Sequence, residues 1–327
     1  MNIGIDIGYY ATKAVVNDRQ VVFPSFAAPF TASRVSLNHR DAIAIESESG
    51  HFLVGDQALR LGQGARQESA QWLGSPEWLS LFYASLSELT TATNFAARVV
   101  IGLPLADYDR DKRAIAEIVR GRHSFKRNGR RAQSFDVSDL RCIPQAWGAV
   151  LDELLSENGK VRNEAIADQR VAVLDIGGHT VNYLAVDGLA DIPAESRGTN
   201  RGTWSVVRAV RDFLDREHPD LSRHNDHTLM RAAVDRRIFD GQDKIDLAPV
   251  VNPIINDIGD EIVRTARQYW GQGAGTYRQV LVIGGGAHLW SDHIHQAFTH
   301  ARVLDEPVMA NARGFAKFAA YLGENDG

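Results

Sequence analysis

The chain has 327 residues, which is enough for two domains that each bury a core. Its formal net charge of −5 gives no general attraction to nucleic acid or to a membrane surface. A single cysteine, Cys142, excludes an intrachain disulfide, and no apolar run approaches the ~20 residues that span a bilayer. We therefore expect a cytoplasmic protein with no secretion signal and no direct membrane contact.

The first half of the chain is predicted to alternate strands and helices. Asn128-Gly129 indicates a hairpin with a type I′ turn, because both central residues of that turn need positive φ. The helices are predicted from apolar side chains that recur at helical spacing. The expected elements are strands at 2–6, 11–17, 19–24 and 97–103, helices at 78–93, 106–121 and 145–156, and a hairpin over 123–137.

A polar stretch over 157–169 is predicted to separate a second domain that repeats this order. The terminal helix is expected to pack back on the first domain. The expected elements are a hairpin over 171–183, a crossover helix at 204–216, a charged helical region reaching 239, a long helix at 254–271, a strand at 279–283 and a helix at 311–322.

One short signature occurs twice, once in each predicted domain. Asp6-Ile7-Gly8 and Asp175-Ile176-Gly177 each end an apolar strand and lead into a small or polar turn that carries threonine. Backbone amides of two such turns can bind a polyphosphate, while the two carboxylates hold a hydrated Mg²⁺. Either motif alone is an ordinary turn; the pair predicts nucleotide binding between two related domains.

Three further features have both a functional and a structural interpretation. Lys13 suits a phosphate contact or a solvated strand position, and Gln145 suits orientation of a water or a plain helix start. Gly284-Gly285-Gly286 follows a predicted buried strand, where glycines permit close approach of a nucleotide, although flexible loops look the same. The chain has neither a Walker P-loop nor a dinucleotide fingerprint.

The remaining chemical groups point to no other activity. The basic segment 120–131 has no interleaved stacking aromatics, so a solvated hairpin is favoured over direct nucleic-acid binding. The histidines show no H-x-x-x-H or H-E-x-x-H pair, so a structural zinc site is not expected, and no nucleophile elbow is present.

The ordered motifs resemble those of the actin, chaperone and sugar-kinase ATPase superfamily. Within it they are most similar to bacterial actin-like proteins of the ParM/StbA plasmid-segregation type. In chain order, the resemblance rests on Asp6-x-Gly8, Ile143-Pro144-Gln145-Ala146, Asp175-Ile176-Gly177-Gly178-x-Thr180, Gly284-Gly285-Gly286 and Ala310-Asn311-Ala312-Arg313-Gly314-Phe315.

The resemblance implies an α/β fold: two related domains of the actin-like, ribonuclease H-like type with a nucleotide cleft between them. Domain I would span 1–157, with subdomain IB inserted at about 31–95, and be completed by 311–327; domain II would span 158–310. Catalytic roles would fall to Gln145, Asp175 and Asp6, and the two aspartates would hold Mg²⁺ largely through water. The nucleotide-binding residues would be Gly8, Tyr9, Tyr10, Thr12, Lys13, Gly177, Gly178, His179, Thr180, Gly284, Gly285 and Gly286.

The same resemblance implies a Mg²⁺-dependent ATPase that assembles into cytoskeletal filaments, with GTP as an acceptable substitute for ATP. Its partners would be further copies of itself and a DNA-binding adaptor protein on a centromere-like site, for plasmid partition. The alternative is a small-molecule kinase or phosphatase of the same fold that does not polymerise. A sugar kinase would need a further acidic base, and the sequence offers no convincing one.

Three positions depart from the family pattern. Tyr9 and Tyr10 are bulky where relatives carry small or polar residues, and Asn182 stands where ParM-like sequences usually have aspartate. The segment 31–73, where subdomain IB and its filament contacts would lie, resembles nothing that can be aligned.

Overall fold

A computed structural model describes residues 1–30, 42–61 and 72–325. The chain forms two compact units, Met1–Glu164 with Met309–Gly327, and Ala165–Val308. The sequence analysis placed the changes of domain at 157/158 and 310/311. Much of the segment 31–73, which could not be aligned, lies outside the described residues.

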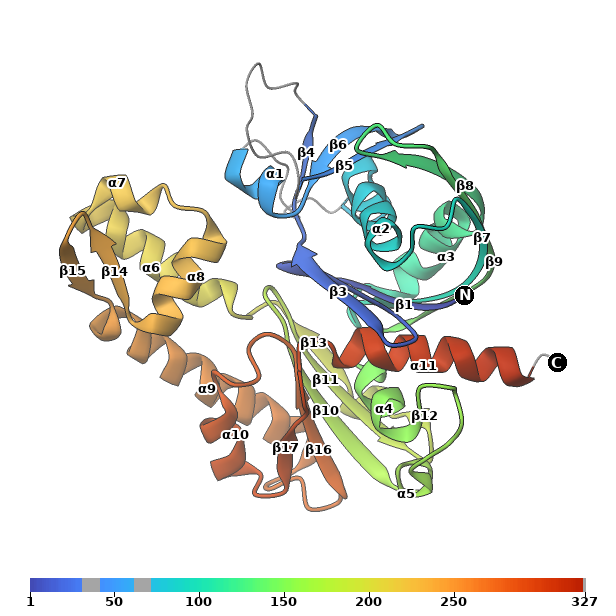
Figure 1. The fold of residues 1–327 in the computed structure, drawn as a ribbon. Coiled ribbons are helices and arrows are strands. Elements are labelled where there is room, and N and C mark those ends of the chain that lie inside the picture. Colours follow the sequence, from blue (N-terminus) through green and yellow to red (C-terminus); the bar gives the residue numbers. More distant parts are fainter. Residues whose placement is uncertain (31–41, 62–71, 326–327) are drawn as a thin grey trace. The chain divides into compact units, whose positions relative to one another are not determined.

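The first unit is built on a nine-stranded sheet of order β3-β2-β1-β7-β9-β8-β5-β6-β4 (Figure 1). Its strands are β1 (Asn2–Ile7), β2 (Ala11–Val16), β3 (Arg19–Pro24), β4 (Ala27–Pro29), β5 (Ile43–Ser47), β6 (Gly50–Val54), β7 (Asn94–Leu103), β8 (Gly121–Arg127) and β9 (Gln133–Pro144). Its helices are α1 (Asp56–Leu61), α2 (Pro76–Leu89), α3 (Tyr108–Val119), α4 (Trp147–Leu154) and α11 (Ala310–Asn325), and α5 (Glu164–Ala167) lies at the boundary.

Helix α2 shows how the sequence builds the core of this unit. Ser75 accepts a hydrogen bond from the Trp78 amide and Pro76 occupies the first turn, so the helix has a defined start. Trp78 and Phe82 are buried and stack with ring centroids 6.2 Å apart. The predicted helix at 78–93 is therefore present but ends at Leu89, where Thr90 turns to an extended conformation.

The predicted type I′ turn is confirmed. Asn128 and Gly129 have φ of 51° and 66°, and the Arg130 amide donates to the Arg127 carbonyl at 2.9 Å. Two basic side chains of this segment have acidic partners: Lys126 pairs with Glu46 and Arg127 pairs with Glu88. These pairs agree with the interpretation of 120–131 as a solvated hairpin.

Helix α11 packs on β1 and α4 of the first unit through glycines. A Cβ at Gly4 would overlap backbone atoms of α11, and a Cβ at Gly314 would overlap the Gly148 carbonyl of α4. Only glycine allows the backbones to approach this closely. Arg313 and Lys317 of α11 also contact Asp152 of α4, at 2.8 and 2.7 Å.

The second unit has a sheet of order β12-β11-β10-β16-β17, with β13 also paired to β11, and a separate β14–β15 hairpin. Its strands are β10 (Arg170–Ile176), β11 (Val181–Asp187), β12 (Ala190–Asp191), β13 (Arg197–Thr199), β14 (Arg237–Asp240), β15 (Asp243–Asp246), β16 (Gln279–Ile283) and β17 (Ala301–Val303). Its helices are α6 (Trp204–Glu217), α7 (Pro219–Ser222), α8 (Asp226–Asp235), α9 (Ala248–Trp270) and α10 (Ser291–Ala297), with the short 3₁₀ turn η1 (Pro193–Glu195).

Two expectations for this unit are wrong in detail. The helical region predicted to reach 239 ends at Asp235, because Arg236 adopts a left-handed conformation that stops α8 and starts β14. Helix α9 begins at Ala248 rather than near 254, because Pro253 lies inside the helix instead of ending it. Among the described helices, none combines the length and apolarity needed to cross a bilayer.

The two units repeat one arrangement of strands. In the first, β1 pairs antiparallel with β2 and parallel with β7. In the second, β10 pairs antiparallel with β11 and parallel with β16. Asp6 and Asp175 stand at matching places in β1 and β10, so the duplicated signature corresponds to a duplicated structure.

Candidate functional site

The turn between β1 and β2, residues 7–11, is called loop 1. It is closed by a hydrogen bond from the Gly8 amide to the Ala11 carbonyl, at 3.1 Å. Asp6, at its start, is 2 % exposed and lies opposite Lys13 in the hairpin register. Thr12 is fully buried, and its hydroxyl lies 2.8 Å from that of Ser25, so it supports the hairpin from the interior.

Asp6 is the centre of a polar cluster in the first unit. Lys13 Nζ lies 2.9 Å from Asp6 Oδ2, and Gln145 Nε2 donates to Asp6 Oδ1 at 2.6 Å. Gln145 follows the last strand β9 and is anchored by its own amide, which donates to the Leu103 carbonyl at 2.8 Å. The structure thus brings together Asp6, Lys13 and Gln145, three residues that the sequence analysis selected.

The turn between β10 and β11, residues 176–180, is called loop 2 and has the same closure. The Gly177 amide donates to the Thr180 carbonyl at 2.9 Å, as Gly8 does to Ala11 in loop 1. Asp175 is 3 % exposed and lies opposite Asn182 in the register. The two loops therefore share both the turn hydrogen bond and the buried carboxylate that precedes it.

The triple glycine lies against the base of loop 2. The Gly286 amide donates to the Ile176 carbonyl at 2.9 Å. Gly284 has φ of +90°, and a Cβ there would overlap the Ile176 carbonyl and lie 2.8 Å from Asp175 Oδ1. A Cβ at Gly285 would meet nothing within 4 Å. Gly284 and Gly286 are required by close packing, whereas Gly285 borders open space.

Lys13 and Asn182 occupy equivalent positions but differ in their contacts. Lys13 neutralises Asp6, whereas Asn182 is 1 % exposed and neither its amide nitrogen nor its oxygen has a hydrogen-bond partner within the described part of the chain. A buried carboxamide without partners is costly, so its place beside Asp175 favours a role toward a bound group.

Each of the two buried aspartates is a suitable ligand for a hydrated magnesium ion. Mg²⁺ usually keeps several waters and takes only one or two carboxylates together with substrate phosphates. Asp6 and Asp175 supply one buried carboxylate in each unit. Within the residues that the structure covers, no group of three or more histidine, cysteine or acidic side chains could form an all-protein metal cage.

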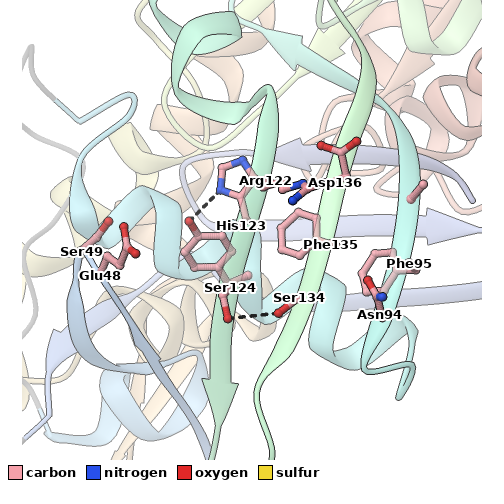
Figure 2. A pocket seen from close by; sticks show the side chains of 12 residues that line it. Glu48, Ser49, Asn94, Phe95, Arg122, His123, Ser124, Ser134, Phe135 and Asp136 are labelled. Atoms are coloured by element: carbon pink, nitrogen blue, oxygen red, sulfur yellow. Dashed lines mark hydrogen bonds between the residues drawn. The ribbon is translucent and has the colours of Figure 1, made fainter.

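A separate hollow of about 800 Å³ lies in the first unit and contains none of the predicted site residues (Figure 2). His123 and Phe135 stack at its wall with centroids 5.0 Å apart, and Tyr83 Oη lies 3.1 Å from His123 Nδ1. Burial and the nearby Glu48 raise the pKa of Tyr83. Because both ring nitrogens of His123 have partners, including the Val119 carbonyl at 2.8 Å, this wall is a satisfied structural cluster.

Several contributing residues escaped the sequence analysis. Asp152 is 4 % exposed and accepts from both Arg313 and Lys317, although only Arg313 lies in a recognised motif. Gly202 lies against loop 2, where a Cβ would come 2.5 Å from the Gly177 carbonyl. Asp152 is an acidic residue in a helix and Gly202 is a glycine in a polar loop. Neither pattern in the sequence predicts these contacts.

Comparison with known proteins gives two family matches. Residues 4–148 match the family described as actin like proteins, N terminal domain. Residues 173–296 match the family described as archaeal actin homologue MreB-like, C-terminal. Together the matches cover most of both compact units.

Individual relatives agree over nearly the full chain. An archaeal actin homolog of Thermoplasma volcanium is 22 % identical over 96 % of this chain and 97 % of its own. Crystal structures of an archaeal actin homolog, native and with ADP, each cover 97 % of this chain and 98 % of their own, with TM-scores of 0.82 and 0.77 at 21 % and 20 % identity.

A ParM subunit from a 15-stranded filament of Clostridium botulinum has a TM-score of 0.80 at 22 % identity, covering 98 % of this chain and 99 % of its own. The two-unit mixed α/β architecture, the duplicated loops and the two family matches lead to one assignment. The chain has the actin-like ATPase fold, with an actin-like N-terminal domain over residues 4–148 and an MreB-like C-terminal domain over residues 173–296.

Proposed function

We propose that this protein binds and hydrolyses ATP with Mg²⁺, using loop 1 and loop 2 to contact the phosphates. The observation that carries the proposal is the matched pair of loops, each closed by the same turn hydrogen bond and each preceded by a buried aspartate. Turn amides of this kind form anion-binding concavities. The ADP complex of an archaeal actin homolog with the same fold supports a nucleotide as the ligand.

A role is proposed for each residue of this site. Asp6 and Asp175 would hold the hydrated ion, which would neutralise charge on the phosphates. Gln145 orients the attacking water from its place beside Asp6. Lys13 Nζ lies close to Gly8 of loop 1, since a Cβ built on that glycine would be 2.9 Å away. From there Lys13 can reach a phosphate oxygen bound at loop 1.

The remaining predicted residues complete the same site. Backbone groups of the two loops contact the phosphates, and the triple glycine lies beside loop 2, where it accommodates the nucleoside. ATP is the proposed nucleotide, and GTP is accepted by the same backbone-lined surface. The residues of the two loops and the triple glycine are Gly8, Tyr9, Tyr10, Gly177, Gly178, His179, Thr180, Gly284, Gly285 and Gly286, and Thr12 supports loop 1 from the interior.

We further propose that the protein assembles with copies of itself into nucleotide-dependent filaments in the cytoplasm. The ParM filament among the structural neighbours supports self-association. Plasmid DNA would then be segregated through an adaptor protein bound at a centromere-like site. Lys126 and Arg127 of the basic segment 120–131 are already paired with Glu46 and Glu88. For this reason we favour binding of DNA through an adaptor over direct contact with DNA.

The test is phosphate release by the purified protein with Mg²⁺ and ATP and no acceptor molecule, recorded together with light scattering. The proposal predicts phosphate release that accompanies a rise in scattering, and loss of both signals in Asp175→Ala. Asp191→Ala is the matched control, because Asp191 is an exposed residue of the same sheet. Phosphate transfer that needs a small-molecule acceptor, without scattering, would establish a kinase of this fold instead.

A further inference from the structure

The start of α6 holds loop 2 through hydrogen bonds to two of the loop's carbonyl groups. The Thr203 amide donates to the Gly177 carbonyl at 3.1 Å, and the Trp204 amide donates to the Gly178 carbonyl at 2.7 Å. The first amides of a helix have no partner inside the helix. Loop 2 therefore caps α6 with two of its own carbonyls, and no side chain caps this helix.

This contact fixes the direction of the loop amides. A trans peptide unit is planar, with its carbonyl and the following N–H pointing in opposite directions, and the described chain has no cis peptide bond. Because the Gly177 and Gly178 carbonyls point to α6, the amides of Gly178 and His179 point away from it. The contact thus orients two successive donors for an anion.

Gly202 makes the close approach feasible. A Cβ at this position would lie 2.5 Å from the Gly177 carbonyl oxygen and 2.7 Å from that of Gly178. Both obstacles are backbone atoms, which cannot rotate aside as a side chain can. Any side chain at 202 must therefore shift loop 2, α6 or both.

Trp204 extends the contact to another helix of the same unit. Its ring lies edge-on to His179 of loop 2, with centroids 6.5 Å apart, and its indole N–H donates to Asp226 at the start of α8, at 3.3 Å. Asp226 is 5 % exposed and is fixed in turn by Arg211 of α6 at 2.6 Å. Trp204 therefore links the start of α6 to both loop 2 and α8.

We propose that Gly202, Thr203 and Trp204 form a positioning element for phosphate binding, in which Gly202 permits the contact and the two amides aim loop 2 at its ligand. This inference rests on the proposed nucleotide function and assigns it residues outside the recognised motifs. These residues act through loop 2 and do not themselves contact the nucleotide.

The test compares Gly202→Ala with wild type by calorimetric titration of ADP with Mg²⁺, and of adenosine, which lacks phosphates. Displacing loop 2 by a fraction of an ångström is expected to weaken ADP binding at least about ten-fold and leave adenosine binding within about two-fold. The matched control is Gly275→Ala in the same unit, because a Cβ there meets nothing within 4 Å. This control should bind both ligands as wild type does.

Equal ADP affinity in Gly202→Ala and wild type, or equal losses for ADP and adenosine, would overturn the inference. If Gly202→Ala does not fold, Thr203→Pro decides by the same criterion. It deletes the amide bonded to Gly177, and Thr203 has φ of −61°, which proline adopts. Failure of wild type itself to bind ADP would instead overturn the proposed function, and this inference with it.

Discussion

Lys13 and Asn182 occupy the same place in two matching hairpins, yet of these two side chains only that of Lys13 has a polar partner among the described residues. Lys13 Nζ lies 2.9 Å from Asp6, directly across the first hairpin. Asn182 faces Asp175 across the second hairpin, 1 % exposed, with neither polar atom hydrogen-bonded to a described residue. The two halves of the duplication have therefore diverged at the residue beside the carboxylate.

This difference predicts opposite effects of Asn182→Leu on stability and on activity. Removing a buried, unpartnered amide should raise the free energy of unfolding of the nucleotide-free protein by about 1 kcal/mol. Hydrolysis should slow at the same time, because the amide is proposed to serve the bound group beside Asp175. Urea unfolding and phosphate release measure the two effects. A loss of stability would show that Asn182 already has a partner in the free protein.

Gln145→Ala is expected to slow ATP hydrolysis while ATP affinity stays near that of wild type. The side chain contacts Asp6 at 2.6 Å and is proposed to orient water, so its loss affects the reacting group more than the bound nucleotide. Single-turnover hydrolysis and calorimetry separate the two quantities. Loss of binding by a folded Gln145→Ala protein would make Gln145 structural instead.

Asp152→Ala is expected to lower the free energy of unfolding by about 3–5 kcal/mol, because it leaves the buried Lys317 with only the exposed Glu157 as a counter-charge among the described residues. Lys317 is 3 % exposed and lies 2.7 Å from Asp152. Adding Lys317→Met should recover part of the loss, since the buried ammonium, which only the exposed Glu157 would still compensate, is then gone. Additive losses in the double variant, measured by denaturant unfolding, would contradict this account.

Cys142 is expected to react slowly with alkylating reagents at neutral pH. Burial raises the pKa of its thiol from an ordinary 9.0 to about 11, and only the thiolate is nucleophilic. The alkylation rate of the folded protein should therefore increase with pH, with a midpoint near pH 11. In denaturant the midpoint of the same curve should lie at a lower pH. The same shift makes folding stability fall as pH rises from about 9 to about 11, because there the unfolded chain ionises first. An alkylation midpoint below pH 9 in the folded protein would contradict the raised pKa of Cys142.

The sequence predicted most strands and the residues at the loop tips because these depend on local patterns. Asp6-Ile7-Gly8 and Asn128-Gly129 encode their turns through the conformational needs of a few adjacent residues. Contacts between segments that are far apart in the sequence could not be predicted from such local patterns. Asp152 and Lys317 are separated by 165 residues, and the need for glycine at 202 arises only from backbone atoms of loop 2.

Two helix ends were misplaced for equally physical reasons. Proline usually marks a helix boundary, but Pro253 lies within α9, where the Pro249 carbonyl does without its usual amide donor. Arg236 takes φ of 57°, a conformation that arginine seldom adopts. The residue type at 236 therefore does not predict that α8 ends there.

The most direct test of the account is sedimentation of purified protein with Mg²⁺ and ATP, with a non-hydrolysable ATP analogue, or with ADP. The account predicts that protein pellets with ATP and is released as ATP is consumed, remains pelleted with the analogue, and stays in solution with ADP. ATP binding without assembly at any protein concentration would contradict the filament-forming function.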